Sequence, residues 1–394
     1  MSSRCHVILC GMRTVLIYRN ELLPVSETFI QKQASELTNF RPVYIGLRRY
    51  EPSLTFRDKP LLLCPNTVAA KTRGMLYKAT GFAPLFHRRA KRLDAALLHA
   101  HFAVDGANAL PLVGAIQKPM IVTLHGNDVT TTDESYGRST AGKIYLAHRQ
   151  RLWDRASAFV CISDFMRRKA LESGFPEHKL RTHYIGIDTN FFRPYVPEYV
   201  VSLRRSVLFV ARLVEKKGCT HLIQAMQQVQ NRFPDARLVI IGDGPERSSL
   251  EAQARRLGVQ CDFRGAQPSS VVRQEMSFAR VFCVPSVTAR SGDSEGLGIV
   301  FAEAQAMGVP VVSSLHGGIP EVVSDGVTGL LAPERDHDRL AQHIIRFFSD
   351  DTFWNDCSRK AVSWIADKFD LQKQTAYLEK IYKDVIQSGG QSQQ

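Results

Sequence analysis

The sequence SGDSEGLGIVFAEAQAMGVPVVSSLHGGIPE, from Ser291 to Glu321, combines a glycine-rich loop, a helix and a buried strand. The apolar segment after Gly298 predicts a helix from about Ile299 to Met307. Gly308 stands where a helix commonly ends in the left-handed conformation. The apolar run Val309–Ser313 then predicts a strand covered on both faces. This order of elements is typical of an α/β protein with a parallel sheet.

The same alternation extends along the whole chain. Short apolar runs are separated by longer amphipathic segments such as Glu27–Leu37, Thr220–Arg232 and Arg247–Leu257. The other predicted strands are Thr14–Tyr18, Leu97–Ala100, Ile121–Leu124, Phe159–Ile162, His183–Ile185, Val207–Val210, Leu238–Ile241 and Val281–Val284. Two such series predict two doubly wound, Rossmann-like α/β domains. A loop rich in Gly, Asp, Asn and Pro at Gly186–Pro194 places the boundary there, giving domains 1–190 and 191–366.

Composition excludes several classes of protein. The 394 residues are 44% hydrophobic and 23% charged, as in globular chains, and no apolar run reaches the ~20 residues of a membrane span. The eight cysteines lack zinc-site spacing, which favours reduced thiols in a cytoplasmic protein. Residues 1–200 carry 28 Lys and Arg against 16 Asp and Glu, whereas residues 201–394 carry 23 against 22. The basic half suits an anionic partner: nucleic acid, lipid surface or phosphate-bearing acceptor.

The richest candidate site lies in the stretch quoted first. The free backbone N–H groups of Gly298, Ile299 and Val300 at the start of the helix form a natural seat for a phosphate. Glu295 precedes this seat and Glu303 follows it. Carboxylates are unsuited to a phosphate but can bind the hydroxyl groups on either side of one. A nucleotide sugar has that layout, while a simple capped helix explains the pattern equally well.

Two loops of the second half add to this site. The sequence FVARLVEKKG places Arg212 and Lys217 after a strand, where they suit a diphosphate, although solvated basic loops are commoner. The sequence IGDGPER contains Gly242 and Gly244, but Arg247 occupies the third glycine position of a dinucleotide fingerprint. This match is weak evidence for NAD, and a tight turn beside a nucleotide explains it as well.

The first half offers polar groups at strand ends. The sequence TLHGND places His125 and Asp128 after an apolar strand, at the edge where open α/β sheets bind ligands. A lone histidine is more often structural. The earlier HAHF carries two histidines without a third ligand, so we predict no metal site. In LPVSETFI, Ser26 is the predicted N-cap of a helix, with Glu27 beside it in a loop that would face the acceptor.

Taken in order, these motifs resemble the family-4 retaining glycosyltransferases of the GT-B architecture, of the bacterial exopolysaccharide and colanic-acid type. The resemblance covers nearly the whole chain, from LPVSETFI, HAHF and TLHGND through CISDFMRRKALESGF to ARLVEKKG, IGDGPER, FRG, VPS and the E-x₇-E motif. It implies transfer of a sugar from a UDP- or GDP-sugar to a glycan or polyprenyl-linked acceptor in bacterial polysaccharide synthesis. It implies neither a cofactor nor a metal.

The resemblance also implies roles for individual residues. Arg212 and Lys217 look like the diphosphate-binding pair, and Glu303 is similar to the glutamate that holds the ribose. Glu295 looks like the carboxylate beside the donor sugar, and His125 like the histidine that reaches this sugar. The backbone from Gly298 to Val300 would hold phosphate and sugar oxygens.

Three further features are expected, of which the first comes from the family pattern. A C-terminal helix, 367–388, would cross back to the first domain, leaving a frayed tail at 389–394. Residues 1–11 precede the first strand and are expected to lie outside the fold. The segment Lys71–Arg92 mixes apolar and aromatic residues with seven Lys and Arg. We expect it to contact an anionic membrane at the cytoplasmic face, against the alternative of a solvated helix face.

Two other functions fit the predicted fold. An NAD-dependent oxidoreductase would need a complete G-x-G-x-x-G and a following acid, neither of which is found. A non-catalytic nucleic-acid or membrane-binding protein would leave the paired glutamates and the Arg212–Lys217 loop unexplained. We therefore expect a glycosyltransferase that does not bind nucleic acid.

Overall fold

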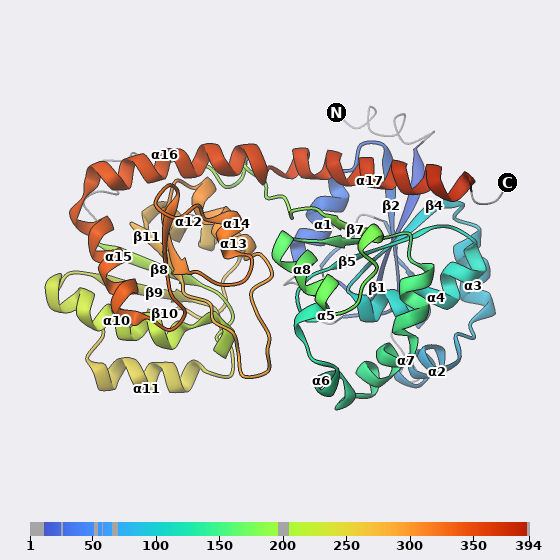
Figure 1. Ribbon diagram of the computed structural model, residues 1–394, viewed down its shortest axis with the longest axis horizontal. Coiled ribbons are helices and arrows are strands. Elements are labelled where there is room, and N and C mark those ends of the chain that lie inside the picture. Colours follow the sequence, from blue (N-terminus) through green and yellow to red (C-terminus); the bar gives the residue numbers. More distant parts are fainter. Residues whose placement is uncertain are drawn as a thin grey trace. The chain divides into compact units, whose positions relative to one another are not determined.

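The computed structural model describes the chain in two compact units (Figure 1). The residues described are 12–24, 27–50, 54–56, 58–64, 70–195 and 205–391, so the expectation for residues 1–11 lies outside them. Unit 1 comprises Met1–Gly186 and Leu371–Gln394, and unit 2 comprises Ile187–Asp370. The division falls a few residues before the predicted boundary at 190.

Unit 1 is built on a parallel sheet with the strand order β3-β2-β1-β4-β5-β6-β7. Its strands are β1 (Arg13–Leu22), β2 (Phe40–Arg49), β3 (Leu61–Leu62), β4 (Ala95–His101), β5 (Met120–Leu124), β6 (Ala158–Cys161) and β7 (Leu180–Thr182). The central strands are buried on both faces, which explains their continuous apolar runs. Because every pair is parallel, the carboxyl ends of all these strands meet at one edge.

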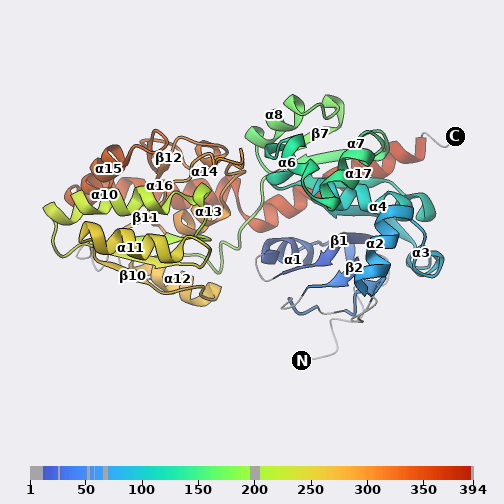
Figure 2. The same cartoon turned by 90° about the horizontal axis from the view of Figure 1, so that it is seen from below.

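Helices cover both faces of this sheet. They are α1 (Thr28–Ser35), α2 (Ala70–Thr80), α3 (Pro84–Lys91), α4 (Ala103–Ile116), α5 (Asn127–Thr130), α6 (Asp133–Gly137), α7 (Thr140–Arg155), α8 (Asp164–Glu172), the short η2 (Glu177–Lys179) and α17 (Leu371–Gln391). The core under α1 and α17 includes Val15, Ile17 and Leu97 from the sheet. On the other face Gly106 of α4 lies so close to Val122 and Leu152 that a β-carbon would crowd them. Figures 1 and 2 both show α2 and α3 side by side, next to α4.

The helix α17 begins and ends a few residues later than the predicted 367–388, at Leu371 and Gln391. It continues to Gln391, so the prediction of a frayed tail from residue 389 is wrong for its first residues, and 392–394 lie outside the described chain. Leu378, Ile381 and Tyr382 belong to the core of unit 1, and the Tyr382 ring packs edge-on against Phe40 at 5.3 Å. This buried apolar face holds the helix to unit 1 over most of its length.

Two local predictions in unit 1 are also wrong. A strand is predicted at His183–Ile185, whereas the observed strand β7 spans Leu180–Thr182 and ends just before it. The His183 ring nitrogen Nε2 instead lies 2.8 Å from the Gln374 carbonyl of α17. The N-cap of α1 is Glu27 rather than Ser26, which lies outside the described residues. The Glu27 carboxylate makes no cap bond, because Arg19 binds it instead.

Unit 2 repeats the design with a six-stranded sheet in the order β10-β9-β8-β11-β12-β13, again parallel throughout. Its strands are β8 (Ser206–Val210), β9 (Arg237–Ile241), β10 (Cys261–Phe263), β11 (Val281–Val284), β12 (Val311–Ser314) and β13 (Gly329–Ala332). Its helices are η3 (Glu215–Lys217), α10 (Cys219–Arg232), α11 (Arg247–Leu257), α12 (Ser269–Phe278), α13 (Ile299–Ala306), α14 (Ile319–Val322), α15 (His337–Ser349) and α16 (Asp351–Lys368). Two doubly wound units confirm the predicted fold class.

Candidate functional site

The predicted donor-binding residues gather at the carboxyl edge of the unit 2 sheet. The loop after β8 carries Arg212 and leads into η3, which ends at Lys217. The loop after β11 carries Glu295 and leads into α13. These loops are joined because the Lys216 carbonyl accepts a hydrogen bond from Val287 N–H at 2.8 Å. A β-carbon at Gly218 would collide with the Pro285 carbonyl oxygen, so this approach requires glycine.

Two ion pairs link the same loops. The Lys217 ammonium binds the Glu295 carboxylate, and the two side chains are only 14% and 10% exposed. Beside them Lys216 pairs with Asp293 at 2.9 Å. Burial alone would raise the pKa of Glu295, but the nearby charges of Lys217 and Lys216 outweigh it and hold this pKa below its usual range. The carboxylate is therefore ionised at neutral pH.

His316, which is not among the predicted residues, holds the backbone of Glu295 in place. The Glu295 backbone N–H donates to His316 Nε2 at 3.2 Å, so this ring nitrogen carries no proton. The proton of the neutral ring therefore sits on Nδ1, which lies 2.8 Å from Glu334 Oε1 and donates to it. Glu334 also accepts the Thr288 backbone N–H at 2.7 Å. This series of hydrogen bonds fixes the loop that carries Glu295.

The start of α13 lies next to Glu295. Gly298 is its N-cap with φ of 79°, a conformation that favours glycine, and a β-carbon there would strike the Phe301 ring. The N–H groups of Ile299 and Val300 belong to the first turn, whose donors have no partner within a helix. Glu303 lies in the second turn and is half-buried. The backbone seat and both glutamates thus occupy one short segment.

Gly242 and Gly244 lie in the loop after β9, close to the backbone of the loop that carries Arg212. A β-carbon at Gly242 would collide with the Ala211 carbonyl, and one at Gly244 would collide with that of Leu213. The Leu213 N–H donates to the Asp243 carbonyl at 2.9 Å. The two glycines therefore let the loop after β9 lie directly against the loop that carries Arg212. Arg212 itself is exposed and forms no ion pair with any residue that the structure describes.

The predicted residues of unit 1 form a second cluster, at the carboxyl edge of its own sheet. His125 Nε2 lies 3.0 Å from Nδ1 of His101, which stacks on His99 at a ring distance of 4.3 Å. His99 Nδ1 lies 2.7 Å from the Tyr382 hydroxyl of α17. Asp128 accepts the backbone N–H of His125 at 2.7 Å and that of Ala103 at 2.6 Å. Asp128 therefore shapes the turn that presents His125.

Burial keeps this histidine cluster neutral. It lowers the pKa of His99 to about 3, and it lowers the pKa of His101 and His125 well below the usual range, with neighbouring histidines adding to the effect. Burial also raises the pKa of Asp128 to about 6, although two backbone donors oppose the shift. His125 Nδ1 is buried without a hydrogen-bond partner among the described residues. A neutral imidazole with one free nitrogen can exchange a hydrogen bond with a hydroxyl group.

Glu27 belongs to an ion-pair network that the sequence did not indicate. Arg19 near the end of β1 binds Glu27 at 2.6 Å and also pairs with Asp105 of α4. The Arg19 guanidinium lies over the Phe102 ring, 4.3 Å from its centre. Phe102 has φ of 73°, a strained value for a bulky residue, and its ring contacts His125 at 4.6 Å. The network thus connects Glu27 to the histidine cluster.

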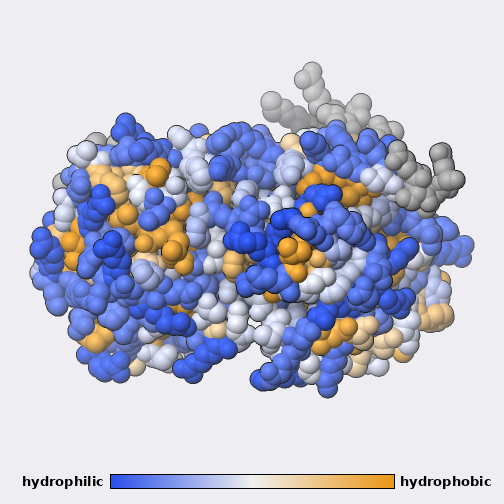
Figure 3. All heavy atoms as spheres, in the orientation of Figure 1, coloured by the Kyte–Doolittle hydropathy of each residue, from blue (hydrophilic) through white to orange (hydrophobic). Residues whose placement is uncertain are grey.

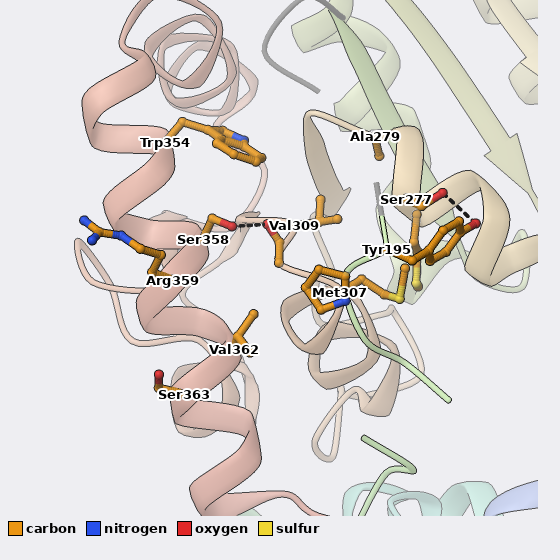
Figure 4. Close-up of a pocket in the computed structure, with 13 residues that line it drawn as sticks. Tyr195, Ser277, Ala279, Met307, Val309, Trp354, Ser358, Arg359, Val362 and Ser363 are labelled. Atoms are coloured by element: carbon orange, nitrogen blue, oxygen red, sulfur yellow. Dashed lines mark hydrogen bonds between the residues drawn. The ribbon is translucent and has the colours of Figure 1, made fainter. Parts of the chain in front are cut away.

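A cavity in unit 2 is lined by none of the predicted site residues described above. It has a volume of about 310 Å³ and is bordered by Tyr195, Ser277, Trp354 and Ser358 (Figure 4). It lies where α12 leads into β11 and where Val309 precedes β12, hence at the amino ends of the strands. Ligands of open α/β sheets bind at the opposite edge. In the described chain no cluster of His, Cys, Asp or Glu is arranged to hold a metal ion, and no helix is long and apolar enough to cross a membrane.

Comparison with known proteins gives consistent matches. The model of Glycosyltransferase Family 4 matches residues 46–191, and that of Glycosyl transferases group 1 matches residues 202–364. A putative colanic acid biosynthesis glycosyltransferase, WcaL of Escherichia coli, is 33% identical over 64% of this chain and 61% of its own length. The crystal structure of Anabaena HepE with UDP and glucose has a TM-score of 0.74 at 18% identity, covering 94% of this chain and 99% of that one.

Coverage differs among these relatives. The chain spans about three fifths of the length of the colanic acid glycosyltransferase. It is also 33% identical to a GDP-mannose-dependent mannosyltransferase of Mycolicibacterium smegmatis, which acts on phosphatidylinositol monomannoside, over 78% of this chain and 80% of that protein. With this match and the family models on both units, the chain belongs to the family-4 glycosyltransferases of the GT-B architecture.

Proposed function

We propose that this protein transfers a sugar, with retention of anomeric configuration and without a metal, from a UDP- or GDP-sugar to a glycan or lipid-linked glycan. The observation that carries the proposal is the Lys217–Glu295 pair beside the first turn of α13. It combines a cation suited to a diphosphate with an ionised carboxylate suited to a sugar. An exposed Arg212 adds a second cation on the same loop.

The reaction requires stabilisation of negative charge on the departing nucleoside diphosphate. Arg212, Lys217 and the N–H groups of Ile299 and Val300 supply it, which is the contribution a divalent cation makes in other transferases. Glu303 in the second turn of α13 is proposed to hold the ribose hydroxyls. Glu295 stabilises the positive charge that develops on the donor sugar.

The relatives support a nucleotide-sugar donor. The Anabaena structure is described as containing UDP and glucose, and the mycobacterial relative as dependent on GDP-mannose. His125 is proposed to bind a donor sugar hydroxyl through Nδ1, its free nitrogen. The proposed biological role is bacterial polysaccharide synthesis in the cytoplasm, at the inner face of the membrane.

The segment Lys71–Arg92 is proposed to contact that membrane. Four large apolar side chains on α2, α3 and the turn between them are 56–73% exposed, namely Met75, Leu76, Phe82 and Leu85. Figure 3 shows orange side chains among blue ones over this region. Apolar side chains surrounded by cations suit an anionic bilayer, at about 1 kcal/mol per cation near the surface. Co-sedimentation with anionic liposomes tests this: Arg88→Ser with Arg89→Ser should weaken binding, and unchanged binding at low and physiological salt would contradict it.

The test of the function is a donor panel. Thermal unfolding with UDP-, GDP- and ADP-sugars and with NAD should show stabilisation by one nucleotide-sugar class only. Donor hydrolysis and transfer are then followed by NMR, which reports the configuration of the released or transferred sugar, and repeated with EDTA. Stabilisation by NAD alone would refute the proposal. Inversion at the anomeric carbon, or loss of activity in EDTA, would refute the retaining or the metal-independent part.

A further inference from the structure

A cavity of about 290 Å³ opens in unit 1 between α2 and α7. It is lined by Asn20 and Glu21 near the end of β1 and by Leu47 and Arg48 near the end of β2. It therefore lies at the carboxyl edge of the sheet, where open α/β sheets bind their ligands. The Asn20 backbone N–H donates to Asp105 at 2.9 Å, and Asp105 pairs with Arg19. The cavity thus adjoins the polar network that extends to His125.

The walls of this cavity are apolar with a positive edge. Leu47, Met75 and Ile144 supply hydrocarbon surface. Arg48 is paired with Glu21, so these two charges cancel. Lys78 also lines the cavity, is partly exposed and forms no ion pair with any described residue. The net charge of the lining is positive, and an anion attached to a hydrocarbon chain is its complement.

The wall formed by α2 contains a glycine that keeps the cavity open. A β-carbon on Gly74 would meet no atom within 4 Å, so neither packing nor a positive φ requires glycine there. Glycine inside a helix is less stable than alanine because its backbone loses more conformational freedom on folding. Gly74 and Lys78 are four residues apart and therefore lie on one face of α2. The helix forgoes this stability at the position where a side chain would enter the cavity.

The cavity is continuous with the exposed apolar surface of α2. Met75 lines the cavity and is also 63% exposed, and Leu76 beside it is 56% exposed. From Lys59 to Leu93 the sequence contains no acidic residue but eight Lys and Arg. A ligand whose chain lies in an anionic bilayer could therefore reach the cavity along a surface that attracts its charge.

We infer that this cavity is a subsite for a lipid phosphate. The hydrocarbon next to the phosphate packs against Leu47, Met75 and Ile144, and the phosphate meets Lys78. The inference rests on the proposed function and deepens it, because it assigns the acceptor to the lipid-linked class. The sugar end of such an acceptor would extend past Asn20 toward the histidine cluster.

The test is calorimetric binding of farnesyl phosphate to the full-length protein, with farnesol and inorganic phosphate as separate ligands. Farnesyl phosphate should bind at least tenfold more tightly than either. Gly74→Leu fills the cavity and should raise the Kd at least tenfold, and Lys78→Gln should raise it about five- to tenfold. The matched control is Gly114→Leu, a glycine of α4 whose added β-carbon also meets no atom within 4 Å. It should leave the Kd unchanged.

Three outcomes would overturn the inference. They are equal Kd values for wild type and Gly74→Leu, binding of inorganic phosphate as tight as that of farnesyl phosphate, and displacement of farnesyl phosphate by short RNA. Stabilisation by nucleotide sugars is measured on the same variants and should persist in Gly74→Leu. Loss of that stabilisation in the wild type would count against the proposed function, while farnesyl phosphate binding would still decide the role of the cavity.

Discussion

Changing Glu295 to Gln should separate nucleotide binding from turnover. Lys217, the proposed ligand of the diphosphate, is already bound to Glu295, and both side chains are nearly buried. A diphosphate must therefore compete with this carboxylate for the ammonium. Glutamine keeps the size and one acceptor oxygen of Glu295 but removes its charge. Glu295→Gln should bind free UDP or GDP more tightly than the wild type while turning over more slowly.

The magnitude follows from the pair. A hydrogen bond to a charged group contributes about 1.5–3 kcal/mol net. If the whole of this energy were gained by the nucleotide, its affinity would rise by roughly 10- to 150-fold, and this is the upper limit of the effect. We expect about tenfold, because the amide oxygen still occupies part of the ammonium. The same loss should lower the melting temperature of unit 2 by about 3–12 °C, at 2–4 °C per kcal/mol for a domain of this size. The kcat should fall because the charge beside the donor sugar is lost.

The assays are calorimetry with UDP and GDP, thermal unfolding and donor-dependent kinetics. Asp293→Asn is the matched control, since it breaks the neighbouring pair with Lys216 without touching Lys217. It should lower the melting temperature but leave nucleotide affinity unchanged. Weaker nucleotide binding by Glu295→Gln would show that the carboxylate does not compete. A wild-type kcat would remove Glu295 from the catalytic machinery.

Four further predictions test other parts of the site. Glu303→Ala should raise the donor KM about 10- to 150-fold with little change in kcat, measured by donor-dependent kinetics, if this carboxylate binds ribose in ground and transition state alike. Arg212→Ala should lower kcat without a change in melting temperature, because the side chain is exposed; a fall in melting temperature instead would indicate a structural role. Tyr382→Phe leaves His99 Nδ1 buried without its partner and should cost about 1–3 kcal/mol of unfolding free energy in urea titrations, whereas Tyr377→Phe, 44% exposed on the same helix, should cost under ~0.5 kcal/mol. The buried neutral histidines should make stability fall with acid, because His99 binds a proton only in the unfolded chain below pH ~6.5. At pH 5.5 each such histidine should therefore cost about 1.3 kcal/mol relative to pH 7, and equal stability at the two pH values would contradict its burial.

The sequence predicted most of the strands that are buried on both faces, although it missed β13, a buried strand of only four residues. The strands β8, β9 and β11 are continuous apolar runs, and their predicted bounds agree within a residue. It missed β2, whose sequence FRPVYIGLRR contains a proline and three arginines and of whose ten residues six are half-buried or exposed. It also missed β10, of which no residue is fully buried. Apolar periodicity detects burial, so strands with partly exposed faces lack the signal.

The site was predictable to the extent that its residues are local. Glu295, the start of α13 and Glu303 lie within nine residues, so one motif contains them. The supporting residues come from distant strands: His316 and Glu334 follow β12 and β13, and Tyr382 reaches His99 across most of the chain length of unit 1. One available signal was a polar residue close to the end of a buried strand, which marks His316, two residues after β12. Nothing in the sequence could pair Arg19 with Asp105, because only the register of β1 beside β4 brings them together.

The distribution of charge in unit 2 suggests an order of events at the proposed donor site. Lys217 is neutralised by Glu295, so it presents no full positive charge to an approaching nucleotide. The exposed guanidinium of Arg212 and the first turn of α13 are not neutralised in this way by the described residues. We therefore expect a diphosphate to be attracted first to these groups, after which Lys217 would exchange Glu295 for a phosphate oxygen. Such an exchange would release the Glu295 carboxylate beside the sugar once the donor is bound, so that its charge would become available where the proposed reaction needs it.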